Sequence, residues 1–287
     1  MRYPNGKTKI LGIIGHPVGH SLSPAMQNAA LTACGLNYCY VPFDVHPGHL
    51  DVAVAGLRAL GVSGFNVTIP HKAAVLSYLD ELDESAEAAG AVNTVHNDNG
   101  RLVGYNTDGD GLVRSLSEDL GFNCTGAGTI ILIGAGGAAR GAVAALCRAG
   151  ATRIVIVNRS RDKARTLAEI MGNRYRGTEV VSVGDAGELL PYLGEAVLLV
   201  NTTSLGMNQE KLPFLKLTDM SPAAMIYDMV YEPPITPLLR DAAECGLRNA
   251  NGLGMLAAQG EYAFHIWTGI RPPTGVMKSV FSSVCTA

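Results

Sequence analysis

The stretch of residues 130–143, which reads IILIGAGGAARGAV, restricts the possible folds more than any other part of the chain. Its first four residues are apolar and predict a short buried strand. The alanine-rich pattern of residues 138–149 predicts a helix, which ends at Gly150. A strand, a glycine turn and a helix in this order are typical of the units from which α/β domains are built.

The glycines of this turn follow a pattern that binds phosphate groups. Gly134, Gly136 and Ala139 fit the motif G-x-G-x-x-G/A, with a predicted strand before it and a helix after it. Glycine lets the backbone come close to an anion, and the free N–H groups and the dipole of the helix attract that anion. A glycine-rich turn without a ligand is the alternative, but the flanking elements favour a dinucleotide site.

The composition argues against several other classes of protein. A chain of 287 residues suits two domains, and 47% apolar with 16% charged residues describes a globular protein. A net charge of −3, without a basic stripe, argues against a nucleic-acid partner. The apolar run of residues 10–14 is too short for a membrane span or a signal peptide. The six cysteines are scattered, so we expect a cytoplasmic protein without a metal site.

Strand and helix patterns alternate along the first third of the chain. Ser23 is a candidate helix N-cap, and the Asn-Asp-Asn-Gly of residues 97–100 is a strong hairpin signal between two strand patterns. The fold class predicted here is an open, mostly parallel α/β sheet with an antiparallel edge. The predicted strands are residues 9–14, 38–43, 64–67, 91–96 and 101–105, and the predicted helices are 24–33, 50–60 and one that Pro70 opens.

A second series of strand patterns begins with the glycine-rich stretch, and helical patterns fill the gaps between them. This rhythm predicts a Rossmann-type doubly wound domain. Two further helical patterns are expected to return to the first domain, which gives one domain of residues 1–107 plus 253–287 and a second, dinucleotide-binding domain of residues 108–252. The strands are expected at residues 130–133, 153–157, 179–183, 196–200, 225–229 and 247–249, and the two last helices at 253–267 and 275–284.

The residues after the second strand of such a domain distinguish the two nicotinamide dinucleotides. An acid there grips the ribose of NAD, whereas a basic residue receives the extra phosphate of NADP. This chain has Asn158, Arg159, Ser160 and Arg161 at that point, with no acid at the end of the strand. A solvated helix end is the alternative, but an arginine in a first helical turn opposes the helix dipole unless an anion binds. We therefore expect NADP.

Three polar clusters follow strands of the first domain, at the edge where open α/β sheets bind ligands. A helix cap at Ser23 explains one of the two serines, and Asp108 is equally well explained as a helix N-cap. Lys72 is expected in the first turn of a helix, whose dipole favours the neutral amine, although a lone lysine is ordinarily a solvated charge. The clusters contain Ser21 and Ser23; Asn66, Thr68 and Lys72; and Asp108.

Together these clusters suit a hydride transfer between an alcohol and a ketone. That reaction needs a group that gives and takes the hydroxyl proton. A pair of Lys72 and Asp108 supplies such a group, and the neighbouring amides and hydroxyls can position a polyhydroxy substrate.

At these positions and at several others, the chain resembles the shikimate dehydrogenase family, which includes relatives that also oxidise quinate. The resemblance runs from about residue 10 to 270, with the motifs in family order. The motifs are Ser-Leu-Ser-Pro (21–24), Asn-Val-Thr-Ile-Pro-His-Lys (66–72), Gly-Ala-Val-Asn-Thr (90–94), Asn-Thr-Asp-Gly (106–109), Gly-Ala-Gly-Gly-Ala (134–138), Asn-Arg-Ser (158–160), Asn-Thr-Thr-Ser-Leu-Gly-Met (201–207), Asp-Met-Val-Tyr (228–231) and Asn-Gly-Leu-Gly-Met-Leu-Ala-Ala-Gln (251–259).

The resemblance implies an NADP-dependent shikimate dehydrogenase with two α/β domains and a cleft between them. Its reaction would be the reversible reduction of 3-dehydroshikimate to shikimate, on the route to chorismate and the aromatic amino acids. Lys72 would be the catalytic acid/base, paired with Asp108. The implied substrate contacts are Ser21, Ser23, Asn66, Thr68, Lys72, Asn93, Asp108, Tyr231 and Gln259. The implied cofactor contacts are Glu84, Gly134, Ala135, Gly136, Gly137, Ala138, Asn158, Arg159, Ser160, Arg161, Lys163, Met229 and Gly252.

Two alternatives stay open from the sequence. One is a quinate/shikimate dehydrogenase of relaxed substrate and cofactor specificity, because such relatives share most of these motifs. The other is a non-catalytic NADP-sensing protein on the same fold, which would be expected to lack Lys72 or Asp108. Thr202 stands where the family often has alanine, a difference that we expect to leave the chemistry unchanged. The partner is expected to be a small molecule, and the chain a monomer or homodimer.

Overall fold

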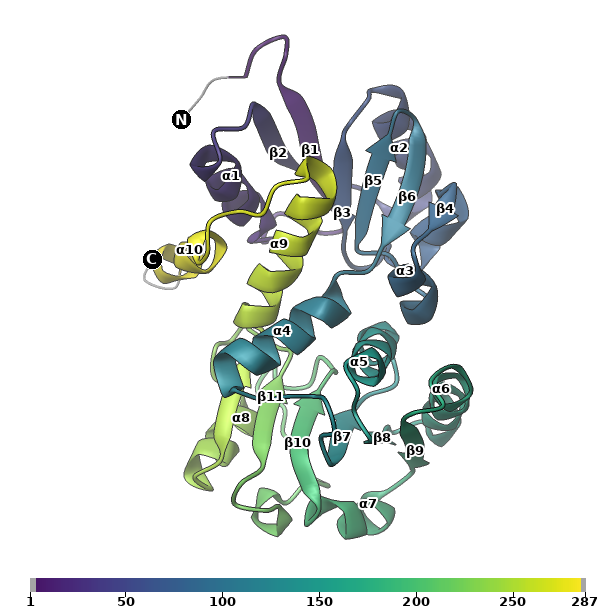
Figure 1. Cartoon of the computed structure of the whole chain (residues 1–287), viewed down its shortest axis with the longest axis vertical. Coiled ribbons are helices and arrows are strands. Elements are labelled where there is room, and N and C mark those ends of the chain that lie inside the picture. The colour runs from purple at the N-terminus through teal and green to yellow at the C-terminus, as the bar shows by residue number, and fades with distance from the viewer. Residues whose placement is uncertain (1–3, 285–287) are drawn as a thin grey trace. The chain divides into compact units, whose positions relative to one another are not determined.

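The computed structural model describes residues 4–284, which form two compact units (Figure 1). The first unit reaches Gly111 and resumes at Leu256, and the second comprises Leu112–Met255. Each unit contains a six-stranded sheet with helices around it, so the predicted α/β class is confirmed. No helix within the described residues is long and apolar enough to cross a membrane.

The sheet of the first unit has the strand order β2-β1-β3-β5-β6-β4. Strand β1 pairs in parallel with β2 and β3, and β4 pairs in parallel with β6. The sheet is therefore mostly parallel, as predicted. The expected antiparallel edge is wrong, because β5 runs against both β3 and β6 inside the sheet. The bounds are β1 (Lys9–Gly15), β2 (Tyr38–Asp44), β3 (Gly64–Val67), β4 (Glu81–Leu82), β5 (Thr94–Asp98) and β6 (Arg101–Tyr105).

Helix α9 (Leu253–Thr268) is hydrogen-bonded to this sheet. The indole nitrogen of Trp267 donates to the carbonyl oxygen of Val95 in β5 at 2.9 Å, across the backbone of Gly64. A Cβ atom on Gly64 would lie 2.3 Å from the indole, so only glycine permits this contact. The remaining helices of the unit are α1 (Ser23–Ala33), α2 (Leu50–Ala59), α3 (Glu84–Ala89) and α10 (Val276–Val284), with short 3₁₀ helices η1 (Pro47–His49) and η2 (Ala74–Tyr78).

Two local expectations for this unit are wrong. Ser23 is the first residue of α1 rather than its N-cap, which is Leu22 without a side-chain bond. Pro70 opens no α-helix, and residues 70–73 form a turn before the short η2. The carbonyl of Lys72 accepts from the backbone N–H of Val92 at 2.8 Å, and the N–H of Leu76, its partner in an α-helix, instead bonds to the carbonyl of Ala73 at 3.4 Å.

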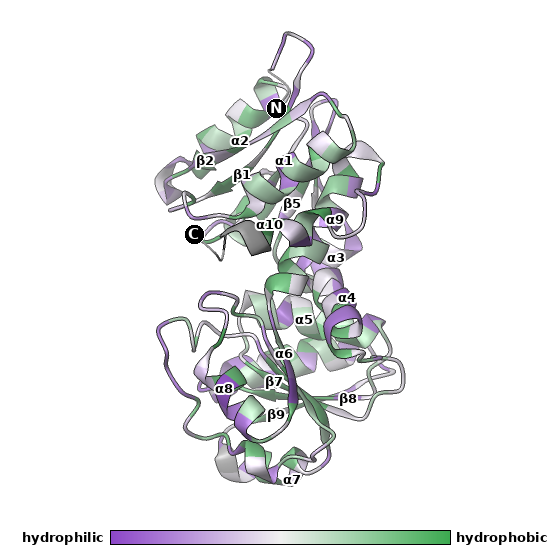
Figure 2. Ribbon diagram, turned by 90° about the vertical axis from the view of Figure 1, so that its left-hand side faces the viewer, coloured by the Kyte–Doolittle hydropathy of each residue, from purple (hydrophilic) through white to green (hydrophobic). Residues whose placement is uncertain are grey.

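The sheet of the second unit has the order β12-β11-β10-β7-β8-β9, and all its pairings are parallel. Its central strand β7 (Thr129–Ile133) is buried along its whole length and appears hydrophobic in Figure 2, as expected for a sheet with helices on both faces. The other strands are β8 (Arg153–Val157), β9 (Glu179–Val183), β10 (Ala196–Asn201), β11 (Met225–Asp228) and β12 (Arg248–Asn251). The helices are α5 (Gly137–Arg148), α6 (Arg161–Arg174), α7 (Ala186–Leu193) and α8 (Pro237–Glu244), with the 3₁₀ helix η3 (Leu217–Asp219) and α4 (Asp108–Leu120), whose first four residues belong to the first unit.

Candidate active site

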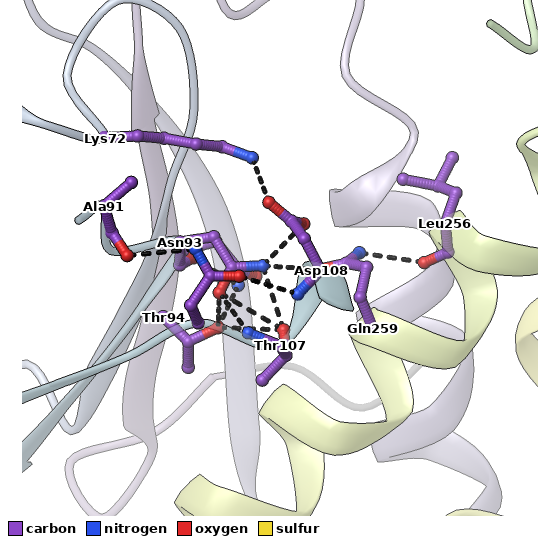
Figure 3. Close-up of polar contacts among 10 residues, drawn as sticks. Lys72, Ala91, Asn93, Thr94, Thr107, Asp108, Leu256 and Gln259 are labelled. Carbon is purple, nitrogen blue, oxygen red and sulfur yellow. Dashed lines mark hydrogen bonds and ion pairs between the residues drawn. The ribbon is translucent and has the colours of Figure 1, made fainter. Parts of the chain in front are cut away.

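A lysine–aspartate ion pair lies at the carboxyl edge of the first sheet (Figure 3). The Nζ atom of Lys72, in the turn after β3, lies 2.6 Å from Oδ2 of Asp108, the first residue of α4. Their side chains are 33% and 21% exposed, so the pair is shielded and still accessible to a ligand. The helix dipole expected to act on Lys72 is absent, because Lys72 lies in a turn.

Asn93 holds the other oxygen of the carboxylate. Its Nδ2 atom donates to Oδ1 of Asp108 at 2.8 Å, and its Oδ1 atom accepts from the backbone N–H of Thr107 at 2.8 Å. The same amide group lies 3.4 Å from Oε1 of Gln259 on α9. Both oxygens of Asp108 therefore have a donor, which leaves Oδ2 in a fixed position opposite Lys72 (Figure 3).

Buried amide and hydroxyl groups lie behind this pair. Asn66, which β3 delivers, is 5% exposed and donates to the carbonyl oxygen of Asn93 at 3.0 Å and to Oγ1 of Thr94 at 3.1 Å. Its own Oδ1 atom accepts from the hydroxyl of Tyr40 at 2.7 Å. Together with Lys72 and Gln259, the predicted residues Asn66, Asn93 and Asp108 thus belong to one hydrogen-bonded cluster, whereas Tyr40 and Thr94 were not predicted.

The two serines and Thr68 lie near this edge on other segments of the first unit. The backbone N–H of Ser23 donates to Oγ of Ser21 at 3.3 Å. A Cβ atom on Gly15 would lie 2.4 Å from the methyl group of Thr68. Only glycine at position 15 therefore allows Thr68 to lie beside β1.

A histidine–aspartate pair that sequence reasoning missed lies at the ends of β1 and β2. Nδ1 of His16 lies 2.9 Å from Oδ1 of Asp44, because the strand register places Gly15 beside Asp44. These side chains are 41% and 59% exposed, more than Lys72 and Asp108. No motif connects the two residues, so only the pairing of the strands could reveal them.

The glycine turn of the second unit has the shape that a phosphate requires. Gly134 has a φ of +115°, and a Cβ atom there would lie 2.5 Å from Oγ1 of Thr202. Gly136 is the N-cap of α5 and makes no side-chain bond, so the first N–H groups of the helix have no intrahelical partner. A Cβ atom on Gly136 or Gly137 would meet nothing within 4 Å. The residues present therefore fit a bound pyrophosphate.

Basic residues follow β8, at the start of α6. Within residues 4–284, neither Arg159 nor Lys163 has a hydrogen-bonded or ion-paired partner, so both cations are available to an anion. The guanidinium of Arg161 differs, because its Nη2 atom lies 2.5 Å from Asp185 and 3.0 Å from Glu188. Since β8 pairs with β9 in register, these acids follow the neighbouring strand. The predicted role of Arg161 in cofactor binding stays a prediction.

Asn201 and Asp228 organise the loops after β10 and β11, and sequence reasoning assigned neither a role. Nδ2 of Asn201 donates to Oδ1 of Asp228 at 2.9 Å, and the hydroxyl of Thr236 donates to the other carboxylate oxygen at 2.6 Å. Both Asn201 and Asp228 are fully buried. Burial, the largest effect, raises the pKa of Asp228, while its hydrogen bonds oppose the rise. Both residues lie in motifs that resemble the family, at 201–207 and 228–231, so these motifs could have identified them.

The other predicted residues lie on several elements of the two units. Met229 and Tyr231 follow β11, and a Cβ atom on Gly252 would lie 2.1 Å from the carbonyl oxygen of Met229. Burial raises the pKa of Tyr231. Glu84 is the exposed first residue of α3 in the first unit.

Known proteins resemble this chain along nearly its whole length. Family models match in three parts: "Shikimate dehydrogenase substrate binding domain" at residues 13–95, "Shikimate / quinate 5-dehydrogenase" at 119–204 and "Shikimate 5'-dehydrogenase C-terminal domain" at 252–280. A curated shikimate dehydrogenase (NADP(+)) of Geobacter sulfurreducens is 54% identical over 275 residues, which cover 96% of each chain.

Solved structures show the same similarity in three dimensions. A shikimate 5-dehydrogenase from Listeria monocytogenes, in complex with shikimate and NAD, matches with a TM-score of 0.91 and 36% identity, covering 98% of this chain and 99% of that one. A shikimate dehydrogenase in complex with NADP+ matches with a TM-score of 0.89 and 39% identity, covering 99% and 98%. From the identity, the coverage and the site residues together, we conclude that this chain belongs to the shikimate dehydrogenase family.

Proposed function

We propose that this protein is an NADP-dependent shikimate dehydrogenase, which interconverts 3-dehydroshikimate and shikimate in the formation of chorismate and the aromatic amino acids. The observation that carries the proposal is the ion pair of Lys72 and Asp108, which supplies a proton-transfer group beside the polar cluster of Asn66 and Asn93. The 54% identity to a curated shikimate dehydrogenase (NADP(+)) supports the same substrate and cofactor.

Lys72 acts as the acid in the direction of reduction and as the base in the reverse direction. Its ammonium group donates a proton to the ketone oxygen as that oxygen gains negative charge, and the neutral amine takes the proton back from the hydroxyl group. The bound nicotinamide cofactor supplies the hydride, or accepts it in oxidation. Asp108 accepts from Lys72 at 2.6 Å and so holds the amine in one direction.

The remaining predicted residues bind and orient the substrate. Shikimate carries a carboxylate and several hydroxyl groups, which hydroxyl and amide side chains can hold. Proposed for this role are Ser21, Ser23, Asn66, Thr68, Asn93, Tyr231 and Gln259, together with Lys72 and Asp108.

The cofactor is proposed to bind at the carboxyl edge of the second sheet. The free N–H groups at the start of α5 would hold its pyrophosphate, with Gly134 and Gly136 allowing a close approach. Arg159 and Lys163 have no hydrogen-bonded or ion-paired partner in the part of the chain that the structure describes, so both can meet the additional phosphate of NADP. Asn158, Ser160, Arg161, Met229, Gly252 and, from the first unit, Glu84 complete the proposed set.

A spectrophotometric assay tests this function and separates it from the two alternatives. The purified protein should reduce NADP+ with shikimate much faster than it reduces NAD+ or acts on quinate. Similar values of kcat/KM for both acids and both cofactors would instead identify a quinate/shikimate dehydrogenase of relaxed specificity. Binding of NADPH without turnover of shikimate would identify a sensing protein. We further propose a cytoplasmic location and a monomer or homodimer, and size-exclusion chromatography with light scattering tests the oligomeric state.

A further inference from the structure

Tyr40 is a buried tyrosine that lies next to the proposed active site and takes no part in the proton transfer itself. It lies on β2, is 2% exposed, and donates its hydroxyl proton to Oδ1 of Asn66 at 2.7 Å. Burial raises the pKa of Tyr40 well above its ordinary value, so the phenol keeps its proton and acts as a donor. Asn66 cannot supply the proton of this bond, because its two amide protons point to Asn93 and Thr94.

The hydrogen bonds that follow Asn66 all have the same direction. Asn66 donates to Oγ1 of Thr94 at 3.1 Å, and Thr94 donates to Oδ1 of Asn93 at 3.0 Å. Asn93 then donates to Oδ1 of Asp108 at 2.8 Å (Figure 3). Each donor is therefore polarised by the bond before it, and the series ends on the carboxylate that holds Lys72.

We propose that Tyr40 is a positioning residue, which acts on the Lys72–Asp108 pair through a one-directional series of hydrogen bonds. The inference rests on the proposed function, because it gives Lys72 and Asp108 their roles. Tyr40 orients the amide of Asn66 and, through Thr94 and Asn93, supports the donor on Asp108.

This role predicts different effects on the two kinetic constants. In Tyr40→Phe, the series loses its first donor, so kcat for shikimate should fall by about twofold to tenfold, the range of one neutral hydrogen bond. KM for shikimate should stay nearly the same, because the series acts on the pair that transfers the proton. A side chain with a merely structural role would loosen the site and raise KM.

Tyr38→Phe is the matched control. Tyr38 lies two residues earlier on the same strand and the same face, and its hydroxyl is outside the series. This variant removes the same atom and should leave both constants unchanged. A Tyr40→Phe enzyme with unchanged kcat, or with a raised KM for shikimate, would overturn the proposal.

A second set of variants tests whether the bonds act as one series. Thr94→Val removes the hydroxyl that both accepts and donates, so adding Tyr40→Phe to it should lower kcat no further. Fully additive losses would show that Tyr40 acts independently, which contradicts the proposal. Thr94→Ser keeps the hydroxyl and should retain most of the turnover, and it replaces Thr94→Val in the comparison if that variant fails to fold.

The unmodified enzyme is assayed first with shikimate and NADP+. An absence of turnover in that assay would contradict the proposed function rather than the role of Tyr40.

Discussion

The Nζ atom of Lys72 lies 2.6 Å from Oδ2 of Asp108, although 36 positions separate the two residues along the chain. Lys72 follows a parallel strand of the first sheet, and Asp108 begins the helix after the hairpin of β5 and β6. The pair exists because β3, β5 and β6 are neighbours in that sheet. A proton-transfer group made in this way depends on strand order as much as on its own two side chains.

Replacing Lys72 tests the acid–base role directly. Lys72→Ala should lower kcat by about 10²- to 10⁴-fold, because no other group would donate the proton. KM for shikimate should change little if the lysine acts mainly in the transition state. Stopped-flow and steady-state assays measure both constants, with the exposed Lys7→Ala as control. Near-normal turnover of Lys72→Ala would exclude the assignment.

His16→Ala should remain active, which separates the exposed His16–Asp44 pair from the chemistry.

Arg159 and Arg161 should respond differently to substitution, although both follow the same strand. Arg159→Ala should raise KM for NADP+ by about 10- to 100-fold, the range of one charged hydrogen bond, and should hardly change KM for NAD+. Arg161 is already bound to Asp185 and Glu188, so Arg161→Ala should have a smaller effect on NADP+. An equal loss with both cofactors in Arg159→Ala would argue against recognition of the extra phosphate.

Gly134 should not tolerate a side chain. Its φ of +115° is unfavourable for other residues, and a Cβ atom would lie 2.5 Å from Oγ1 of Thr202. Gly134→Ala should therefore lower the free energy of unfolding by about 1–3 kcal/mol and weaken the binding of NADPH. Gly172→Ala is the matched control, since Gly172 lies inside α6 with open space around it. It should stabilise the protein by about 0.5–1 kcal/mol. Urea denaturation and fluorescence titration measure the two effects.

The carboxyl group of Asp228 should make the protein less stable as the pH rises. Its pKa is raised above the ordinary 3.8 by burial, so above that pH the folded protein holds a proton that the unfolded chain has lost. Folding therefore binds this proton. The resulting contribution to the free energy of unfolding is complete below pH 3.8 and is lost as the pH rises through the higher pKa of the folded protein. In Asp228→Asn, the amide can keep bonds to Asn201 and Thr236 without titrating.

Urea midpoints from about pH 4 upward should therefore fall less steeply in Asp228→Asn than in the parent protein. Asp228→Ala is the contrasting variant, because it leaves the buried Nδ2 of Asn201 without this acceptor and should destabilise at every pH. Identical slopes in the parent and Asp228→Asn would contradict the proposed titration.

Local patterns in the sequence determined the second sheet and its phosphate turn. The continuous apolar run of β7 predicts a strand buried on both faces, and Gly134 predicts the turn because few other residues adopt its φ of +115°. Lys72 and Asp108 were likewise identified as partners from their residue types and from the family that their motifs resemble.

The tertiary structure alone decided how the first site is held together. Residues 70–73 form a turn in which the carbonyl of Lys72 bonds to Val92, a residue that no local pattern places beside it. The series from Tyr40 through Asn66 depends on which strands become neighbours, and the pairing of Arg161 with Asp185 depends on β8 lying beside β9. Local preferences determine which groups a segment offers, whereas the packing of distant segments determines which partner each buried polar group finds.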